Sequence, residues 1–435
     1  MKPTFSIGIQ HVTRVEGHGN IVLDVKKGRV EKVEWQISEA PRFFEMMLKN
    51  RCYKELQPIS SRICGICSIG HSIASLKATE EALGVEVTEQ TILLRKLALH
   101  GENIQSHILH LGYLVLPDLL GMGSVFPLAN SKHKKELLRV VSLHRFANEF
   151  SELICGRTTH PIRLVVGGFT AIPKKKQLEL LKNKLLEQLE NTQKIAEFIH
   201  KHIDRIPCFE RETEYIALTT PDEYAFYDGV ITSTDTGSLQ DPYKYREYLQ
   251  EYFVPYSTAL HSKHNRESYM VGALARLNLN HKQLHETAGE TIELFKLKPP
   301  IYNPFMNNIA QLIEIIHSIE DSMELVDKLL DMGLKEEKKV EITRKSGHGV
   351  GIVEVPRGLL VHEYKIENER CTYANCVIPT NQNHANIQRD LEEFAPMILD
   401  KPKREIELLL EMLVRAYDPC ISCSTHYLNI VFKES

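Results

Sequence analysis

The chain has 435 residues, of which 43% are hydrophobic and 25% charged, and its formal net charge is −4. This composition is typical of a globular protein with a large core. It provides no basic surface for nucleic acid, because the single lysine triplet, Lys174–Lys176, opens a mixed-charge segment. No apolar run approaches the roughly 20 residues that cross a bilayer, so we expect no membrane span. The N-terminus lacks an apolar signal core and nine cysteines are too few for a disulfide scaffold, so we expect a cytoplasmic location.

The first predicted element is a β-hairpin. Apolar residues alternate in the segments Ile21–Val25 and Val30–Ile37, and Gly28 between them supplies a turn. From residue 41 the periodicity becomes helical. A long helix is predicted over residues 88–111, with Thr88 as its N-cap.

The rest of the chain is also predicted to be mostly helical. Residues 177–202 form a charged helix, and residues 312–330 have apolar side chains at the i, i+3, i+4, i+7 spacing of an amphipathic helix. Residues 340–376 are short, irregular and strand-like, and a final helix passes through 408–413. We therefore predict a mainly α fold (α+β) with long central helices and small β elements at the periphery. Residues 1–426 are expected to form one interwoven unit.

Two Cys-x-x-Cys pairs are the strongest chemical signal. They are Cys64/Cys67 and Cys420/Cys423, almost at opposite ends of the chain. Two intervening residues let both sulfurs face one ion, and four thiolates suit zinc, nickel, copper(I) or iron–sulfur chemistry. A structural zinc site is the plain alternative, but zinc ribbons place their pairs about 15–20 residues apart. The other five cysteines are interpreted as core residues or surface thiols.

At these pairs the sequence resembles the large subunits of nickel–iron hydrogenases. The resemblance covers segments that run in family order through nearly the whole chain. Any one of these short matches is weak evidence, whereas the ordered set is specific. Besides the two cysteine pairs, the matching segments are Thr13–Gly19, Arg42–Glu45, Gly156–Arg157, His160–Pro161, Gly167–Gly168, Leu274–Arg276, Val355–Gly358 and Ile378–Thr380.

The resemblance implies a nickel–iron centre on the four cysteines. Cys64 and Cys420 would be terminal nickel ligands, and Cys67 and Cys423 would bridge nickel to an iron that carries carbon monoxide and cyanide. Such a buried anionic cluster requires a fixed cation, and an arginine keeps its charge there. By family position Arg357 would hydrogen-bond one cyanide.

Two further residues are placed beside this centre by the same resemblance, and a third, Asp418, precedes the C-terminal pair. Thr380 would hydrogen-bond the second cyanide, and His71 would be a donor near a bridging sulfur. Asp418 would orient Arg357. The alternatives are a surface ion pair for Arg357, a cap or turn hydroxyl for Thr380, a surface histidine for His71 and an Asp-Pro turn for Asp418.

The activity implied is the reversible heterolytic cleavage of dihydrogen. The metals would act as Lewis acids, and a thiolate beside them would take the proton. Cys420 is the candidate base, with the Arg357 guanidine as the competitor. Glu16 would then receive the proton from Cys420, unless it forms a structural salt bridge with Arg14 or another cation.

A second metal site is implied at Glu45 and His426. The family binds magnesium or a similar divalent cation there through this glutamate, a backbone carbonyl and the histidine. The alternative is a surface glutamate and an incidental histidine. Nine residues, Tyr427–Ser435, follow His426. We predict that a maturation protease removes this extension after nickel insertion.

The remaining expectations concern partners and rival functions. The chain has no further cysteine clusters for electron relays, so an iron–sulfur small subunit is implied. The motifs look most like cytoplasmic bidirectional hydrogenases, which implies an electron-acceptor module with nicotinamide, deazaflavin or another carrier. The rivals are a quinone-site subunit of the complex I type, from a lineage that has lost the nickel cysteines, and a zinc-stabilised scaffold without redox activity.

Overall fold

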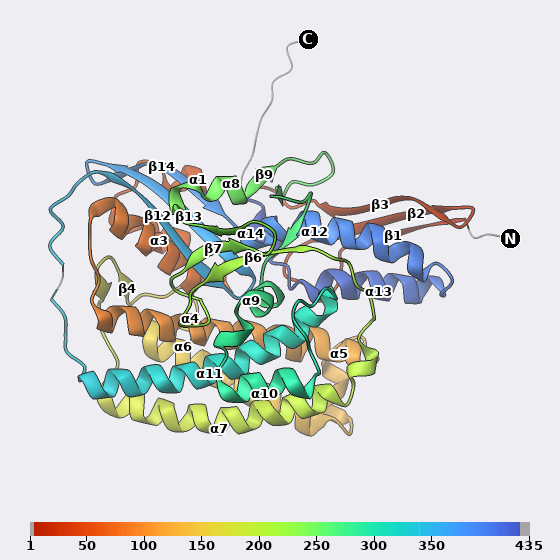
Figure 1. The fold of residues 1–435 in the computed structure, drawn as a ribbon, viewed down its shortest axis with the longest axis horizontal. Coiled ribbons are helices and arrows are strands. Elements are labelled where there is room, and N and C mark those ends of the chain that lie inside the picture. The colour runs from red at the N-terminus through yellow and green to blue at the C-terminus, as the bar shows by residue number, and fades with distance from the viewer. Residues whose placement is uncertain (1–3, 339, 427–435) are drawn as a thin grey trace, which may run out of the picture.

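A computed structural model of the chain describes residues 4–338 and 340–426, so the predicted C-terminal extension lies outside the described residues. Long helices form the base of the molecule, and small sheets and short helices cover it (Figure 1). The predicted fold class, mainly α with small sheets, is confirmed. None of the described helices combines the length and apolarity needed to cross a bilayer.

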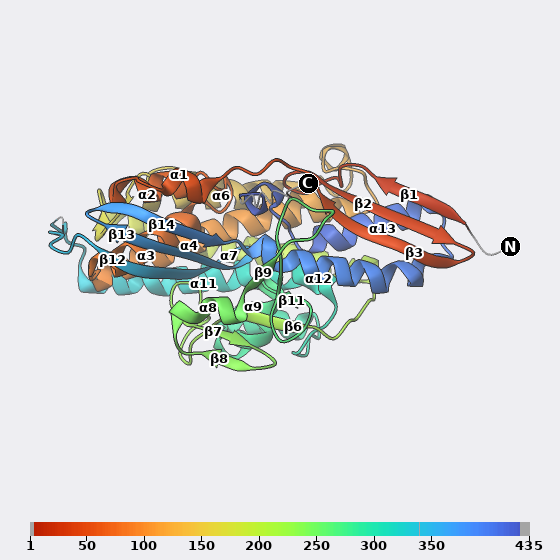
Figure 2. The same ribbon diagram turned by 90° about the horizontal axis from the view of Figure 1, so that it is seen from above.

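The N-terminal sheet is antiparallel and contains the predicted hairpin. Its strands β1 (Phe5–Ile9), β2 (Gly19–Lys26) and β3 (Arg29–Ile37) are ordered β1-β2-β3. Lys27 and Gly28 both have positive φ, 51° and 75°, as a tight two-residue turn requires. Figure 2 shows this sheet at one end of the molecule beside α12 (Pro379–Phe394) and α13 (Lys403–Ala416).

Four long helices pack side by side as the base: α4 (Glu89–Leu109), α6 (Lys134–Cys155), α7 (Lys175–His200) and α11 (Asn307–Met332). The Thr88 hydroxyl accepts a hydrogen bond from Thr91 N at 3.1 Å, so the predicted N-cap of α4 is confirmed. α4 runs on into a π-helical turn, His110–Val115.

The C-terminal sheet differs from the expected peripheral position. Its antiparallel strands β12 (Gly347–Val355), β13 (Gly358–Glu367) and β14 (Arg370–Val377) are largely buried, and the sheet packs on α3 (Ser68–Leu83). The reason is a row of glycines in β12 that lets the strand lie against the helix backbone. A Cβ on Gly347, Gly349 or Gly351 would stand 1.9, 2.2 or 2.0 Å from a carbonyl oxygen of α3.

The remaining elements connect and cover these layers. A four-stranded sheet has the order β11-β6-β7-β8, and β4-β5 and β10-β9 are two-stranded. Short 3₁₀ helices occupy Phe126–Asn130, Ile203–Arg205, Pro242–Lys244, His281–Gln283, Pro304–Met306 and Ala395–Ile398. The other bounds are α1 (Phe44–Leu48), α2 (Tyr53–Ser60), α5 (Leu116–Leu119), α8 (Tyr245–Tyr248), α9 (Ala273–Asn280), α10 (Glu286–Leu294), α14 (Ile421–Ser424), β4 (Leu164–Val165), β5 (Gly168–Phe169), β6 (Glu214–Thr219), β7 (Val230–Ser233), β8 (Gly237–Leu239), β9 (Gln250–Tyr252), β10 (His261–Lys263) and β11 (Tyr269–Met270).

Candidate metal centre

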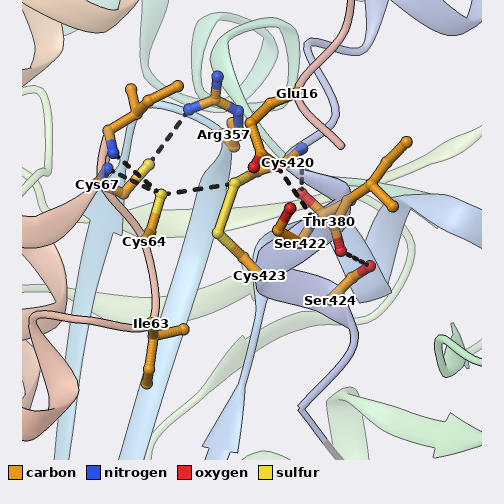
Figure 3. Close-up of a disulfide and its surroundings, with 12 residues drawn as sticks. Glu16, Ile63, Cys64, Cys67, Arg357, Thr380, Cys420, Ser422, Cys423 and Ser424 are labelled. Carbon is orange, nitrogen blue, oxygen red and sulfur yellow. Dashed lines mark hydrogen bonds between the residues drawn. A yellow bond between two sulfur atoms is a disulfide. The ribbon is translucent and has the colours of Figure 1, made fainter. Parts of the chain in front are cut away.

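The two cysteine pairs meet in the interior although more than 350 residues separate them in sequence. Cys64 and Cys67 lie in the turn between α2 and α3, and Cys67 is the N-cap residue of α3. Cys420 is the N-cap residue of α14, and Cys423 lies within that helix. Figure 3 shows the four cysteine side chains close to one another. All four are 2–4% exposed. The two ends of the chain therefore converge on one buried site.

Three of the four sulfurs form a tight group. Those of Cys64, Cys420 and Cys423 all lie within 4.8 Å of one another, and Cys64 Sγ is 3.5 Å from Cys420 Sγ. Cys67 Sγ instead contacts an arginine. Cys420 and Cys423 are joined by a disulfide, which differs from the four separate thiolates expected.

The turn that carries the first pair favours a thiolate at Cys64. Its sulfur accepts hydrogen bonds from the amides of Ile66 and Cys67, at 3.3 and 3.1 Å. Hydrogen bonding from Cys67 and, more weakly, the nearby Arg357 charge outweigh burial and lower the pKa of Cys64 to about 7. The hydrogen bond with Cys64 and burial raise the pKa of Cys67 well above its ordinary value. Cys64 is therefore the first of the two to ionise.

Arg357 is the fixed cation of the site, and it sits in the tight turn between β12 and β13. Its guanidinium donates to Cys67 Sγ and Ser106 Oγ, both at 3.3 Å, and to the carbonyl of Asp418 at 2.6 Å. It also pairs with the Asp418 carboxylate at 2.8 Å. Burial alone would lower the pKa of Arg357, but Asp418 and the cysteines raise it above its ordinary value. The expected contact between Asp418 and Arg357 is therefore present, and the guanidinium is not at the surface.

Thr380 and Glu16 both hold the segment that carries the second pair. Thr380 Oγ1 accepts a hydrogen bond from Cys420 N at 3.1 Å. The backbone of Glu16 pairs with that of Cys420 as a parallel bridge, and Glu16 Oε2 accepts from Ser422 N at 3.1 Å. Arg14 pairs with Asp118 instead, and no ion pair of Glu16 occurs among the described residues. The salt-bridge alternative for Glu16 therefore has no support.

Arg42 ties the two cysteine segments together. Its guanidinium donates to the carbonyl of Ile63 at 2.6 Å and to the carbonyl of Ser422. Its own amide donates to the carbonyl of Thr425 at 2.7 Å. One side chain therefore bridges residues next to Cys64 and next to Cys423. Arg42 was expected only as a member of the motif Arg42–Glu45, and no role was predicted for it.

His71 is buried, but its predicted contact with a bridging sulfur is not among the hydrogen bonds of the described residues. Its Nδ1 lies 3.1 Å from His362 Nε2. Burial and the neighbouring His362 lower the pKa of His71 well below its ordinary value, so the ring is neutral. The surface alternative is excluded by its 2% exposure, and its role beside the metals stays a prediction.

Glu45 and His426 meet at the edge of a cavity of about 680 Å³. His426 Nδ1 is 2.5 Å from Glu45 Oε1, and both side chains are buried. Glu251 also lines this cavity, and burial raises the pKa of its carboxyl to about 7. Asn381 Nδ2 bonds Glu251 at 3.2 Å, and its buried Oδ1 has no hydrogen-bond partner. Glu45 and His426 offer oxygen and nitrogen donors that a hard divalent cation accepts, but among the described residues Glu251 does not join them in a group whose ligand atoms all lie within 4.8 Å of one another.

Glu102 and Ser106, which were not predicted, reach the centre from α4. The available signal in the sequence is a row of polar residues four apart, 102, 106 and 110, which continues from α4 into the π-helical turn. All three side chains are at most 1% exposed.

Comparisons with known proteins agree with this geometry. The sequence matches the family described as nickel-dependent hydrogenase over residues 42–137 and 211–426, and one described as HoxL-like over residues 6–40. It is 35% identical over 426 residues to the alpha subunit of sulfhydrogenase 1 of Pyrococcus furiosus, covering 98% of both chains. It is also 35% identical to the alpha subunit of sulfhydrogenase 2 of that organism, covering 98% of this chain and 100% of the relative.

The fold is similar to that of a solved NAD+-reducing NiFe-hydrogenase in the H2-reduced state. The TM-score is 0.87 and the sequence identity 26%, and the match covers 97% of this chain and 100% of that one. Both cysteine pairs lie inside the matched family segments.

Proposed function

The chain belongs to the nickel-dependent hydrogenases and is a large subunit of the nickel–iron type, and from this we propose that its two cysteine pairs hold the nickel–iron centre. The observation that carries the proposal is the meeting of both pairs in one buried site that faces Arg357. In the loaded enzyme all four sulfurs would be thiolates. The family match decides against a non-redox zinc scaffold and against a quinone-site subunit.

When bound, the nickel–iron centre with its carbon monoxide and cyanide ligands supplies the Lewis acidity that polarises dihydrogen. The chain supplies the proton acceptor. Arg357 is held charged by Asp418, and so it is a poor base. Cys420 is therefore the preferred acceptor of the proton. Arg357 and Thr380 would orient the cyanides, and the Thr380 hydroxyl lies beside the second pair, where it accepts from Cys420 N.

Glu16 is the proposed next proton carrier. Its backbone runs beside Cys420, and its carboxylate lies on the adjoining segment at Ser422 N. A carboxylate with a single amide donor and no ion pair among the described residues can exchange a proton without breaking a salt bridge. His71 would complete the surroundings of the sulfurs as a neutral donor.

The proposal includes a second metal and a processing step. Magnesium or a similar divalent cation would bind at Glu45 and His426, and Glu251 adds a carboxylate that the family position alone did not suggest. The predicted removal of Tyr427–Ser435 by a maturation protease concerns residues outside the described part.

Partner subunits are implied by the relatives, two of which are named as the alpha subunits of sulfhydrogenases. We propose that electrons pass from this chain to an iron–sulfur small subunit, and from there to a nicotinamide, deazaflavin or other soluble module. Among the described residues the other cysteines form no metal-binding group, which supports an external electron path. A cytoplasmic location stays a prediction.

The proposed centre is tested by metal analysis and infrared spectroscopy of the purified holoenzyme. Near-stoichiometric nickel and iron, together with bands of metal-bound carbon monoxide and cyanide, are expected. Zinc alone, without such bands, would overturn the proposal.

The proton path is tested with Glu16→Gln. This variant should keep its metals and infrared bands but lose about 10²-fold or more in turnover, the range typical of a lost proton carrier. Glu39→Gln is the matched control, because Glu39 lies nearby and bonds His18 N instead of the Cys420 segment. If Glu16→Gln exchanged the hydrogen atoms of dihydrogen with deuterated solvent as fast as the wild type does, the path through Glu16 would be excluded.

A further inference from the structure

Two buried acceptor groups receive the backbone amides at the N-terminus of α3, directly behind the first cysteine pair. The first amides of a helix have no partner within the helix and need acceptors from elsewhere. Cys64 Sγ accepts from the amides of Ile66 and Cys67. The amides of Ile69 and Gly70 both donate to the carboxylate of Glu102, at 2.6 and 2.9 Å. The N-cap residue, Cys67, provides no side-chain acceptor of its own.

Glu102 reaches this position from α4, one turn before Ser106. Its side chain is 1% exposed, and it forms no ion pair among the described residues. Burial raises the pKa of its carboxyl to about 8, against the lowering effect of the two amides, and the charges of Cys64 and Arg357 act on it as well. A buried carboxyl group without a counter-ion is costly unless hydrogen bonds hold it. Here the hydrogen bonds that hold the Glu102 carboxyl group come from the first-turn amides of α3, those of Ile69 and Gly70.

Gly70 shows how closely this arrangement is packed. A Cβ on Gly70 would stand 3.0 Å from Glu102 Oε1 and 2.1 Å from Val355 Cγ1. Val355 ends β12 and leads into the turn that carries Arg357. The N-terminus of α3 is therefore packed between Glu102 and the turn that carries Arg357. Displacing the Glu102 carboxyl group would disturb both the cysteine turn and the Arg357 turn.

We propose that Glu102 is a positioning residue of the metal centre: by closing the N-terminus of α3, it fixes the Cys64–Cys67 turn against Arg357. The inference rests on the proposed function for the identity of the centre. The contact by which Glu102 fixes the Cys64–Cys67 turn does not depend on any metal. This contact and its effect on the metal centre can therefore be measured separately.

The first measurement is amide hydrogen exchange in the purified full chain, resolved by mass spectrometry over residues 64–72. Glu102→Gln leaves one carbonyl acceptor for two amides, so exchange in this segment should rise at least tenfold. Glu102→Asp keeps the acidic group but withdraws it, and an intermediate rise is expected. If Glu102→Gln does not fold, Glu102→Asp supplies the comparison. Unchanged exchange in the folded variants would overturn the inference.

The second measurement is the infrared spectrum of the loaded holoenzyme, which reports the surroundings of the iron ligands. Glu102→Gln should move the carbon monoxide and cyanide bands outside the spread of wild-type spectra. Thr88→Ala is the control, because it removes the N-cap of α4 away from the cysteines and should lower stability without moving the bands. Raised exchange with unmoved bands would reduce Glu102 to a helix cap and overturn the inference.

Wild-type enzyme without such bands would overturn the proposed function and, with it, the link to a nickel–iron centre. The exchange data would then still decide whether Glu102 holds the Cys64–Cys67 turn.

Discussion

Gly351→Ala tests whether the contact between β12 and α3 sets the geometry of the metal centre. Gly351 lies where β12 crosses α3, opposite Ala74. A Cβ there would stand 2.0 Å from the Ala74 carbonyl oxygen and 2.6 Å from Ala78 N. Both are helix backbone atoms, and they cannot rotate away as the end of a side chain can. The strand and the helix must therefore separate.

The size of the effect follows from these distances. The first contact must open from 2.0 Å to about 3.4 Å before it becomes ordinary van der Waals contact. Overpacking a buried site usually costs about 1–3 kcal/mol, and we expect the upper end because backbone has to move. With an unfolding entropy of about 2.1 cal/mol/K per residue, about 3 kcal/mol corresponds to a drop of about 3 °C in Tm for this chain.

The same separation should weaken the centre. Arg357 follows the end of β12, and its 3.3 Å contact with Cys67 joins the two elements that the new methyl group pushes apart. Calorimetry of the chain and nickel content per chain are the assays, and both values should fall. Gly289→Ala is the control, since a Cβ there meets nothing within 4 Å and alanine favours its helix by about 0.5–1 kcal/mol. A Gly351→Ala protein with wild-type Tm and full nickel would refute the reasoning.

Three further outcomes are expected. Arg42→Met removes the hydrogen bonds to the carbonyls of Ile63 and Ser422, so the nickel content should fall markedly while Tm falls only slightly. A nickel content per folded chain equal to that of the wild type would contradict this. Arg357→Lys should abolish turnover and shift the infrared bands, because one ammonium group cannot make the four contacts of the guanidinium. Unshifted bands would argue against contact between Arg357 and the iron ligands. Burial would raise the pKa of Glu314, but Arg276 and His107 hold it at about 2, below the ordinary 4.5. Its ionised form therefore stabilises the fold fully above about pH 4.5, and the stabilisation is lost as the pH falls towards about 2. The difference in Tm between wild type and Glu314→Gln should shrink over that range, and a constant difference would refute the assignment.

Features that depend on neighbouring residues in sequence were predictable. The hairpin turn at Gly28 and the N-cap at Thr88 occur as expected, because each is decided by the conformation or hydrogen bond of one residue and its near neighbours. The cysteine pairs are equally local as motifs. Their resemblance to a family then predicted which distant segments belong together.

α12 was not predicted, although it carries Thr380. Its sequence from Asn381 to Asn386 is polar and has no apolar stripe, yet the helix is buried. Its side-chain amides bond partners from other elements; for example, Asn383 Oδ1 accepts from Val271 N, and Gln382 donates to Leu359 O. A polar helix can be buried only when such partners exist, and no local pattern reveals them.

Local sequence is sufficient to predict the residue types and spacings that suit metal binding, and the elements that carry them. Which groups surround the cysteines follows only from the folded chain. Glu102 caps a helix 32 residues away in sequence, and Arg42 binds a carbonyl 380 residues away, near the other end of the chain. Such partners are chosen by close packing and by the need of every buried polar group for a bond, and both are properties of the whole fold.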